Sequence, residues 1–192
     1  MSDSASGIQL AALISLGEER ALELRNLIRD VPGFPHDPII FRDITPLLAD
    51  GPAFHDVIEA FASAAQDLQV DVVAGMEARG FILGAALAIR LGVGVIPLRK
   101  AGKLPPPVLR VDYGLEYGTA AMELTAGTLP VGSNVLIVDD VLATGGTAKA
   151  AVELVEQAGG NVTALLFLME LVGLGGAEQL AGHRVETLLR VT

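Results

Sequence analysis

The chain lacks cysteine and tryptophan, and aromatic residues make up only 4% of its 192 residues. Without cysteine there can be no disulfide bond, no thiolate metal site and no cysteine nucleophile. Basic residues are also few, because 13 Lys and Arg stand against 23 Asp and Glu, a formal net charge of -10. This excess of acid disfavours tight binding to a nucleic-acid backbone, but it leaves open a small anion held in a local basic pocket.

Long apolar runs are missing too. The most apolar stretch, residues 164–174, is interrupted by Glu170 and falls short of the ~20 residues that span a bilayer. The N-terminus has no basic residue and leads into no long apolar run, which is unlike a secretory signal. We therefore expect a cytoplasmic protein that binds neither membranes nor nucleic acid. Apolar residues still make up 51% of the chain, enough for a sizeable core.

Hydrophobic patterns along the chain predict strands that alternate with helices. Short apolar runs are typical of buried strands, and apolar stripes with a period near 3.6 residues are typical of helices. This alternation predicts an α/β fold with a mostly parallel twisted sheet and helices on both of its faces. Strands are expected at 70–74, 93–98, 135–138, 162–169 and 185–191, and helices at 8–30 (with a break at Gly17), 51–68, 80–91, 147–158 and 177–181.

Three segments fall outside this alternation. Residues 1–7 are expected to form a disordered tail that precedes a single domain over residues 8–192. Four prolines between residues 31 and 48 exclude a long regular element there. Residues 99–130 are rich in glycine, proline and charge, with a strand or hairpin expected near 119–124. A loop of that length in a compact domain is usually functional.

The strongest functional signal is the run from Val135 to Ala150, where an apolar strand ends in two acids and a Thr/Gly turn opens a helix. Glycines let the backbone approach a ligand, and the helix start offers unpaired N–H groups at its positive dipole end, which suits phosphate. The acids suit a ligand that also carries hydroxyl groups or a bound Mg²⁺. The run is neither a Walker A nor a dinucleotide-binding pattern, and an ordinary turn with capping acids is the alternative.

This run resembles the signature with which type I phosphoribosyltransferases bind phosphoribosyl pyrophosphate (PRPP). Further segments resemble the adenine-specific members of that family, in the same order, so that the resemblance extends from about Phe34 to Leu180. It implies a small N-terminal hood at about 31–48, which covers the base, and a long flexible flap at about 99–118. The additional segments are FRDITP at 41–46, GMEARGF at 75–81, PLRKAGKLP at 97–105 and LEYG at 115–118.

The resemblance implies a purine salvage reaction, in which the phosphoribosyl group of PRPP passes to adenine and gives AMP and diphosphate. Glu116 would accept the proton that leaves the purine ring, and Tyr117 would cover the site when the flap closes. Arg79 would stabilise charge on the leaving diphosphate, together with Lys100. Other PRPP contacts would come from Arg99 and Lys103, and the base would be contacted by Ile40, Arg42 and Tyr117.

The resemblance also assigns the phosphate turn and the cofactor. Asp139 and Asp140 would hold the ribose hydroxyls, and residues 144–147 would hold the 5′-phosphate. Mg²⁺ would be bound mainly by PRPP, with Asp139 reaching it through water and no direct protein ligand. A homodimer is the usual assembly of the family. The full set expected at the PRPP signature is Asp139, Asp140, Ala143, Thr144, Gly145, Gly146 and Thr147.

Several of these residues have a plainer interpretation. Arg79 could form a surface ion pair, the basic cluster at 99–103 could be a solvated loop, and Arg42 could fasten the hood to the core or to a second subunit. Two other functions stay open: transfer to another purine base, and a non-catalytic PRPP-binding regulator. Ala143 argues against the first, because 6-oxopurine transferases commonly carry Asp there. The absence of a basic recognition helix argues against the second.

The flap departs from the family pattern at two places. Three consecutive prolines at 105–107 stiffen it where the family often has glycine after Leu-Pro. The later arm reads Glu123-Leu-Thr125, without the acid and histidine that commonly follow. Neither departure touches the phosphate turn, Arg79 or Glu116.

Overall fold

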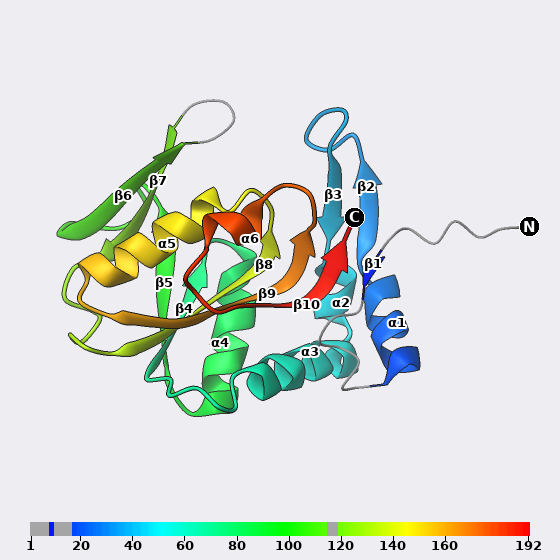
Figure 1. Ribbon diagram of the computed structural model, residues 1–192, viewed down its shortest axis with the longest axis horizontal. Helices are drawn as coiled ribbons and strands as arrows, with labels where there is room; N and C mark the ends of the chain where they lie inside the picture. Colours follow the sequence, from blue (N-terminus) through cyan, green and yellow to red (C-terminus); the bar gives the residue numbers. More distant parts are fainter. Residues whose placement is uncertain (1–7, 10–16, 115–118) are drawn as a thin grey trace, which may run out of the picture.

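A computed structural model describes residues 8–9, 17–114 and 119–192 of the chain (Figure 1). An eight-stranded sheet runs through it in the order β1-β10-β9-β8-β4-β5-β7-β6. Neighbouring strands from β10 to β5 pair in parallel, whereas β1, β7 and β6 are added at the edges by antiparallel pairing. The strands are β1 (Ile8–Gln9), β4 (Val72–Met76), β5 (Gly94–Lys100), β6 (Val108–Gly114), β7 (Thr119–Thr125), β8 (Asn134–Leu142), β9 (Asn161–Leu171) and β10 (Val185–Val191).

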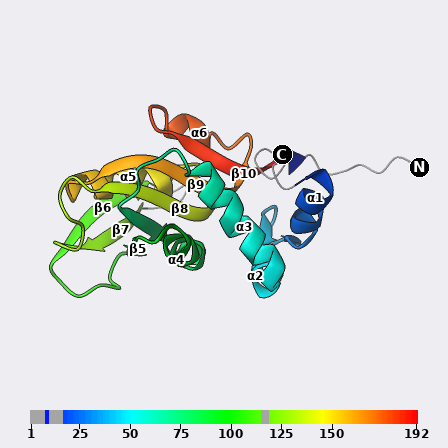
Figure 2. The ribbon, with the colours of Figure 1, turned by 90° about the horizontal axis from the view of Figure 1, so that it is seen from below.

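Helices cover both faces of this sheet. Figure 2 shows α3 and α4 on one face and α5 and α6 on the other. Strand β8 explains why both faces need cover, because Leu136 and Val138 enter the core under α4 while Val135 and Ile137 enter the core under α5. The helices are α1 (Glu18–Asn26), α2 (Thr45–Ala49), α3 (Gly51–Ala64), α4 (Arg79–Leu91), α5 (Gly146–Gln157) and α6 (Gly176–Gln179).

A separate two-stranded sheet lies in the segment where the hood is expected. Strand β2 (Arg29–Pro32) pairs antiparallel with β3 (Ile40–Asp43). In Figure 1 this hairpin stands at one end of the molecule and the β6–β7 hairpin at the other. Both extend beyond the side of the main sheet at which its parallel strands end. The start of α5 lies between them (Figure 1). The two hairpins therefore flank the edge at which the phosphate turn is expected.

The predicted α/β class, with its mostly parallel sheet, is confirmed, and the helix start at Asp50 shows why local patterns succeed. The Asp50 carboxylate accepts a hydrogen bond from the Ala53 amide at 2.9 Å, and Pro52 sits in the first turn of α3. The apolar stripe of α3 then buries Val57 and Phe61 completely. Local capping and periodicity agree with the tertiary structure here.

The helix predicted over residues 8–30 is wrong at both ends. Ile8–Gln9 forms a strand that pairs with β10, and Arg29 and Asp30 belong to β2. Among the described residues of this range, only Glu18–Asn26 is helical, and it begins directly after Gly17, which has a φ of 89°. Apolar spacing predicted a longer helix because pairing with a distant strand leaves no trace in local periodicity. Strand β6 was also missed, inside the segment treated as flap.

The described residues contain no helix that is both long and apolar enough to cross a bilayer.

Candidate active site

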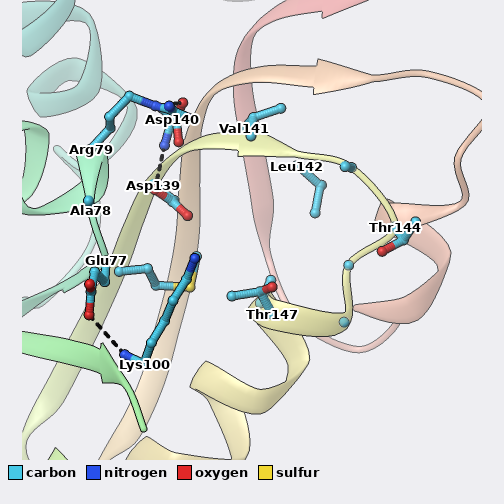
Figure 3. Close-up of a pocket in the computed structure, with 15 residues that line it drawn as sticks. Glu77, Ala78, Arg79, Lys100, Asp139, Asp140, Val141, Leu142, Thr144 and Thr147 are labelled. Atoms are coloured by element: carbon cyan, nitrogen blue, oxygen red, sulfur yellow. Dashed lines mark hydrogen bonds and ion pairs between the residues drawn. The ribbon is translucent and has the colours of Figure 1, made fainter. Parts of the chain in front are cut away.

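A pocket of about 320 Å³ opens where β4 and β8 end, at the carboxyl edge of the parallel sheet (Figure 3). Open α/β sheets bind their ligands at this edge, because loops that leave neighbouring parallel strands meet there. The turn after β4, the end of β5 and the turn after β8 all contribute to its wall. The lining residues are 76–79, Lys100 and 139–148.

The Thr/Gly turn between β8 and α5 is held by close backbone packing. Gly145 has a φ of 84°, and a Cβ built on it would lie 2.7 Å from the carbonyl oxygen of Gly176 in α6. A Cβ on Gly176 would in turn lie 2.3 Å from the carbonyl oxygen of Ala143. Only glycine satisfies both the positive φ and this approach. The turn is therefore fixed against α6, and the first amides of α5, which have no partner within the helix, line the pocket.

Two buried acids close the pocket on the β8 side. The Asp140 amide donates a hydrogen bond to Asp139 Oδ1 at 2.9 Å. Burial raises the pKa of Asp139 well above its usual value, and the neighbouring charge of Asp140 raises it further. Asp140 Oδ2 accepts a hydrogen bond from Arg79 Nε at 2.5 Å. The pair can thus accept hydrogen bonds from ligand hydroxyls while Arg79 balances one negative charge.

Arg79 connects three parts of the site. It starts α4 directly after the turn that follows β4, and its guanidinium binds Asp140. Its Cζ atom also lies 5.1 Å from the centre of the Phe41 ring in β3. Phe41 packs edge-on against Phe34 at 5.3 Å between ring centres. The hood is therefore in contact with the residue expected at the diphosphate side.

The basic cluster divides into one residue that lines the pocket and two that do not. Figure 3 shows the Lys100 side chain directed into the pocket, toward the space between Asp139 and Thr147. Arg99 Nε instead donates to Glu77 Oε2 at 3.3 Å, and Lys103 Nζ is paired with Glu77 Oε1. Burial alone would raise the pKa of Glu77, but the bonds from Lys103, the Lys100 amide and Arg99 lower it overall.

The structure thus brings Arg79, Lys100 and residues 139–147 together in one pocket wall. Arg99 and Lys103 lie next to it on Glu77. Ile40 is 45% exposed on β3, and Arg42 forms an ion pair with Asp30 across the hood hairpin, so neither lies in the described wall. The expected proton acceptor Glu116 and the expected cover residue Tyr117 lie outside the described residues.

Sequence reasoning gave no role to Glu77 or to Gly176, although both shape the site. The Gly175-Gly176 pair was a signal of close backbone approach, but its partner at Ala143 could not be inferred from local sequence. Glu77 appeared only as part of the segment at 75–81, and its contacts with Arg99, Lys100 and Lys103 depend on the pairing of β4 with β5. The Glu77–Ala78 peptide bond is cis.

The donor set fits a magnesium ion that is bound chiefly by substrate. Among residues 8–9, 17–114 and 119–192, no cluster of three or more His, Asp or Glu side chains is arranged to hold a metal. Asp139 and Asp140 nevertheless line the pocket, and carboxylate oxygens are hard ligands that suit Mg²⁺. Mg²⁺ commonly combines one or two carboxylates with water and substrate phosphates.

Comparisons with known proteins agree with this geometry. Residues 46–170 match a family model described as phosphoribosyl transferase domain. The adenine phosphoribosyltransferase of Kineococcus radiotolerans is 58% identical over 160 residues, which cover 83% of this chain and 86% of that protein. The corresponding protein of Clavibacter michiganensis is 54% identical over 166 residues, covering 86% of this chain and 94% of that protein.

Solved structures give the same result. The crystal structure of adenine phosphoribosyltransferase from Thermoanaerobacter pseudethanolicus has a TM-score of 0.86 and 47% identity, covering 88% of this chain and 98% of that chain. The Saccharomyces cerevisiae enzyme, crystallised with adenine and an imino-altritol bisphosphate, has a TM-score of 0.83 and 41% identity, with the same coverage of both chains.

Proposed function

This chain belongs to the adenine phosphoribosyltransferases: it transfers the phosphoribosyl group of PRPP to adenine, giving AMP and diphosphate, and we propose that the pocket at the end of β8 is where it does so. The observation that carries this proposal is the joining of the Thr/Gly turn, two buried acids and two basic side chains in one wall. Such a wall offers separate contacts to a phosphate, a sugar and a diphosphate.

The phosphate turn would hold the part of PRPP that is retained in the product. The amides of α5 and the hydroxyls of Thr144 and Thr147 line the pocket and suit the 5′-phosphate. Asp139 and Asp140 suit the ribose hydroxyls, because both residues line the pocket and carboxylate oxygens can accept hydrogen bonds. Anchoring the sugar at both ends would leave its reactive carbon positioned for attack.

The leaving diphosphate would lie on the opposite side of the pocket. Arg79 and Lys100 are the two cationic side chains in the described wall, and their charges would stabilise the negative charge that develops as the bond to diphosphate breaks. Arg99 and Lys103 stand next to them on Glu77 and would add to the positive field there. In the hood, Ile40 and Arg42 would contact the base.

The proton balance of the reaction requires an acceptor near the base. A nitrogen of adenine forms the new bond to the sugar carbon, the bond to diphosphate breaks, and a proton leaves the purine ring. Ala143 stands in the turn and cannot accept it. Glu116 would accept this proton, and Tyr117 would exclude water when the flap closes.

Magnesium would be held mainly by the diphosphate and hydroxyl oxygens of PRPP, with Asp139 in contact through water. When bound, the ion would neutralise charge on the diphosphate and so make it a better leaving group. The protein's own contribution would be to fix the sugar and to hold Asp139, which is 9% exposed, at the pocket wall.

We further propose a homodimer that forms through α4 and β5. Ile96 and Leu98 of β5 enter the core under α5, so Val95 points to the opposite face, where α4 lies. There Val95 is exposed together with Ile82 and Ile89 of α4, and Ile89 is 83% exposed. An apolar face of this kind suits a second copy. Light scattering of the wild type and of Ile89→Glu tests this, and an unchanged mass would contradict it.

The deciding experiment is a panel of adenine, hypoxanthine, guanine and xanthine, each incubated with PRPP and Mg²⁺ while AMP, the other nucleotides and diphosphate are measured. Adenine alone should be converted at an appreciable rate. Faster conversion of hypoxanthine, guanine or xanthine would favour a transferase for that base. PRPP binding without release of diphosphate in the presence of any of the bases would favour a regulator. The cytoplasmic location expected from the sequence stays a prediction.

A further inference from the structure

Glu77 lies between the diphosphate side of the pocket and the root of the flap. Its carboxylate, whose side chain is only 8% exposed, accepts hydrogen bonds from the Lys100 amide at 3.0 Å and from Arg99 Nε at 3.3 Å. It is also paired with Lys103 Nζ. Its own amide donates to the carbonyl of Leu98 at 3.0 Å, which fixes it beside β5. One acid therefore engages three residues of the basic segment at 99–103.

The two cationic side chains that bind Glu77, Arg99 and Lys103, are also expected to bind the diphosphate of PRPP. Lys100 already lines the pocket, whereas Arg99 and Lys103 are turned to Glu77 and do not line it. Arg99 Cζ also lies 5.9 Å from the centre of the Phe81 ring, so this side chain rests against the start of α4. The side chains of Arg99 and Lys103 are partly exposed, so each can exchange one anionic partner for another at little cost in free energy.

A carboxylate in the wall of an anion site also acts directly on the anion. Glu77 is itself a lining residue, and it stays ionised because the cations around it lower its pKa in spite of burial. Its negative charge therefore repels a diphosphate in the pocket and competes with it for hydrogen-bond donors. An acid at this place weakens binding of the group that must leave.

We propose that Glu77 is a positioning residue that substitutes for the diphosphate: it holds Arg99 and Lys103 while the diphosphate side is empty, yields them when PRPP binds, and takes them back as the product diphosphate leaves. The inference rests on the proposed function, because it needs a diphosphate at this side of the pocket. Its consequence is unusual for a residue near an active site, since removal of the charge should strengthen binding of one product.

The test variant is Glu77→Gln, which removes the charge but keeps a side-chain oxygen that can accept the hydrogen bond from the Lys100 amide. Calorimetric titration with magnesium diphosphate should show binding about fivefold tighter than in the wild type. Product inhibition by diphosphate should strengthen by the same factor, and turnover at saturating substrate should fall because release is slower. Raising the ionic strength should shrink the difference, because it arises from charge.

Two further variants isolate the cause. Glu170→Gln makes the same change of charge at another buried carboxylate, which is bonded to Arg190 at 2.9 Å and lies outside the pocket wall, so diphosphate affinity should stay at the wild-type value. In a Lys103→Met background, Glu77→Gln should give a smaller gain, because one of the released cations is gone. If Glu77→Gln fails to fold, Glu77→Asp is used, and its shorter side chain should give a partial gain.

The outcomes separate this inference from the function on which it rests. If the wild type binds neither PRPP nor diphosphate, the proposed function is wrong. If the wild type binds both, but Glu77→Gln binds diphosphate equally well or more weakly, then Glu77 is a structural brace and the inference is overturned. An equal gain in Glu170→Gln would also overturn it, since the effect would then come from net charge alone.

Discussion

The phosphate turn (residues 139–147) and the diphosphate side (residues 77–79 and Lys100, with Arg99 and Lys103 beside them on Glu77) meet at one pocket but are held in place by different forces. The phosphate turn follows a buried strand and packs its backbone against α6, with no room for a Cβ at Gly145. The diphosphate side is held by ion pairs that join the buried Glu77 carboxylate to the partly exposed side chains of Arg99 and Lys103. Ion pairs whose cations are in contact with water contribute only about 0–1 kcal/mol each.

This difference matches what happens to the two ends of the substrate. The phosphoribosyl group stays bound from substrate to product, so a rigid turn that fits it loses nothing by being rigid. The diphosphate enters as part of PRPP and must leave alone, so weak and exchangeable contacts favour turnover. On the proposed function, the chain would combine a packed backbone for the group that is kept with exchangeable side-chain contacts for the group that is released.

The largest effect is expected from Gly145→Val. The new side chain would meet the carbonyl of Gly176 and Cβ of Gln179, and valine is strained at a φ of 84°. The turn would have to move away from α6, and displacement of well-placed contacts by about 1 Å can cost about 100-fold. Calorimetry should therefore show PRPP binding weakened by at least this factor, with the domain still folded by circular dichroism.

Gly159→Val is the matched control for that change. Gly159 has nearly the same φ, 86°, but its neighbours are side-chain atoms of Val131 on the loop before β8. This variant should lose about 1–3 kcal/mol of stability through strain and crowding. Its affinity for PRPP should remain that of the wild type. Equal loss of affinity in both variants would show that strain alone, and not the contact with α6, explains Gly145.

A smaller effect, on chemistry and not on binding, is expected from Glu116→Gln in the flap. If Glu116 accepts the purine proton, its loss should lower turnover with adenine by about two orders of magnitude, the usual scale for a general base. PRPP affinity should stay within a few-fold of the wild type by calorimetry, because the phosphate turn is intact. Turnover equal to that of the wild type would show that Glu116 is not the proton acceptor.

Sequence patterns predicted the phosphate turn well because its determinants are local. An apolar run, two acids and a Thr/Gly turn are consecutive in the chain. Helix α5 lies one residue before its predicted bounds, and β8 begins at Asn134 but extends to Leu142, so that the two acids belong to the strand. That Arg79 and Lys100 join this turn was implied by the resemblance, and the meeting of the carboxyl ends of parallel strands accounts for it. The structure places both in the same wall.

What the sequence could not predict depends on contacts between distant residues. The pairing of β1 with β10, the approach of α6 to Gly145 and the three bonds of Glu77 each join segments that are far apart in the chain. No local pattern encodes which of several acids a lysine will bind. Arg99 and Lys103 were therefore expected beside PRPP, whereas the structure shows them on Glu77.

A moderate effect is expected where the hood meets the diphosphate side. Phe41→Leu would remove the ring over which the Arg79 guanidinium lies, an interaction of about 0.5–1 kcal/mol at partly exposed sites. The KM for adenine should rise about two- to fivefold, while PRPP affinity, which depends on the phosphate turn, should not change. Phe34→Leu keeps the contact between Phe41 and Arg79 and serves as control. A larger rise in the KM for adenine with Phe34→Leu would mean that the shape of the hood, and not its contact with Arg79, determines how adenine binds.

The smallest effect is expected at the root of the hood, where Asp43 is held by exposed contacts. Hydrogen bonds from Thr45, and then the guanidinium of Arg29 at 2.6 Å, lower the pKa of Asp43 from 3.8 to about 2. Because the pKa is lower in the folded state, this carboxylate stabilises the fold above its ordinary pKa, and the contribution disappears as the pH falls from about 3.8 through about 2. Asp43→Asn should thus lower the melting temperature slightly at neutral pH, and the gap from the wild type should close on acidification. A gap that is independent of pH would mean that Asp43 acts through the shape of its turn and not through charge, so that the hood would be fixed by packing as the phosphate turn is.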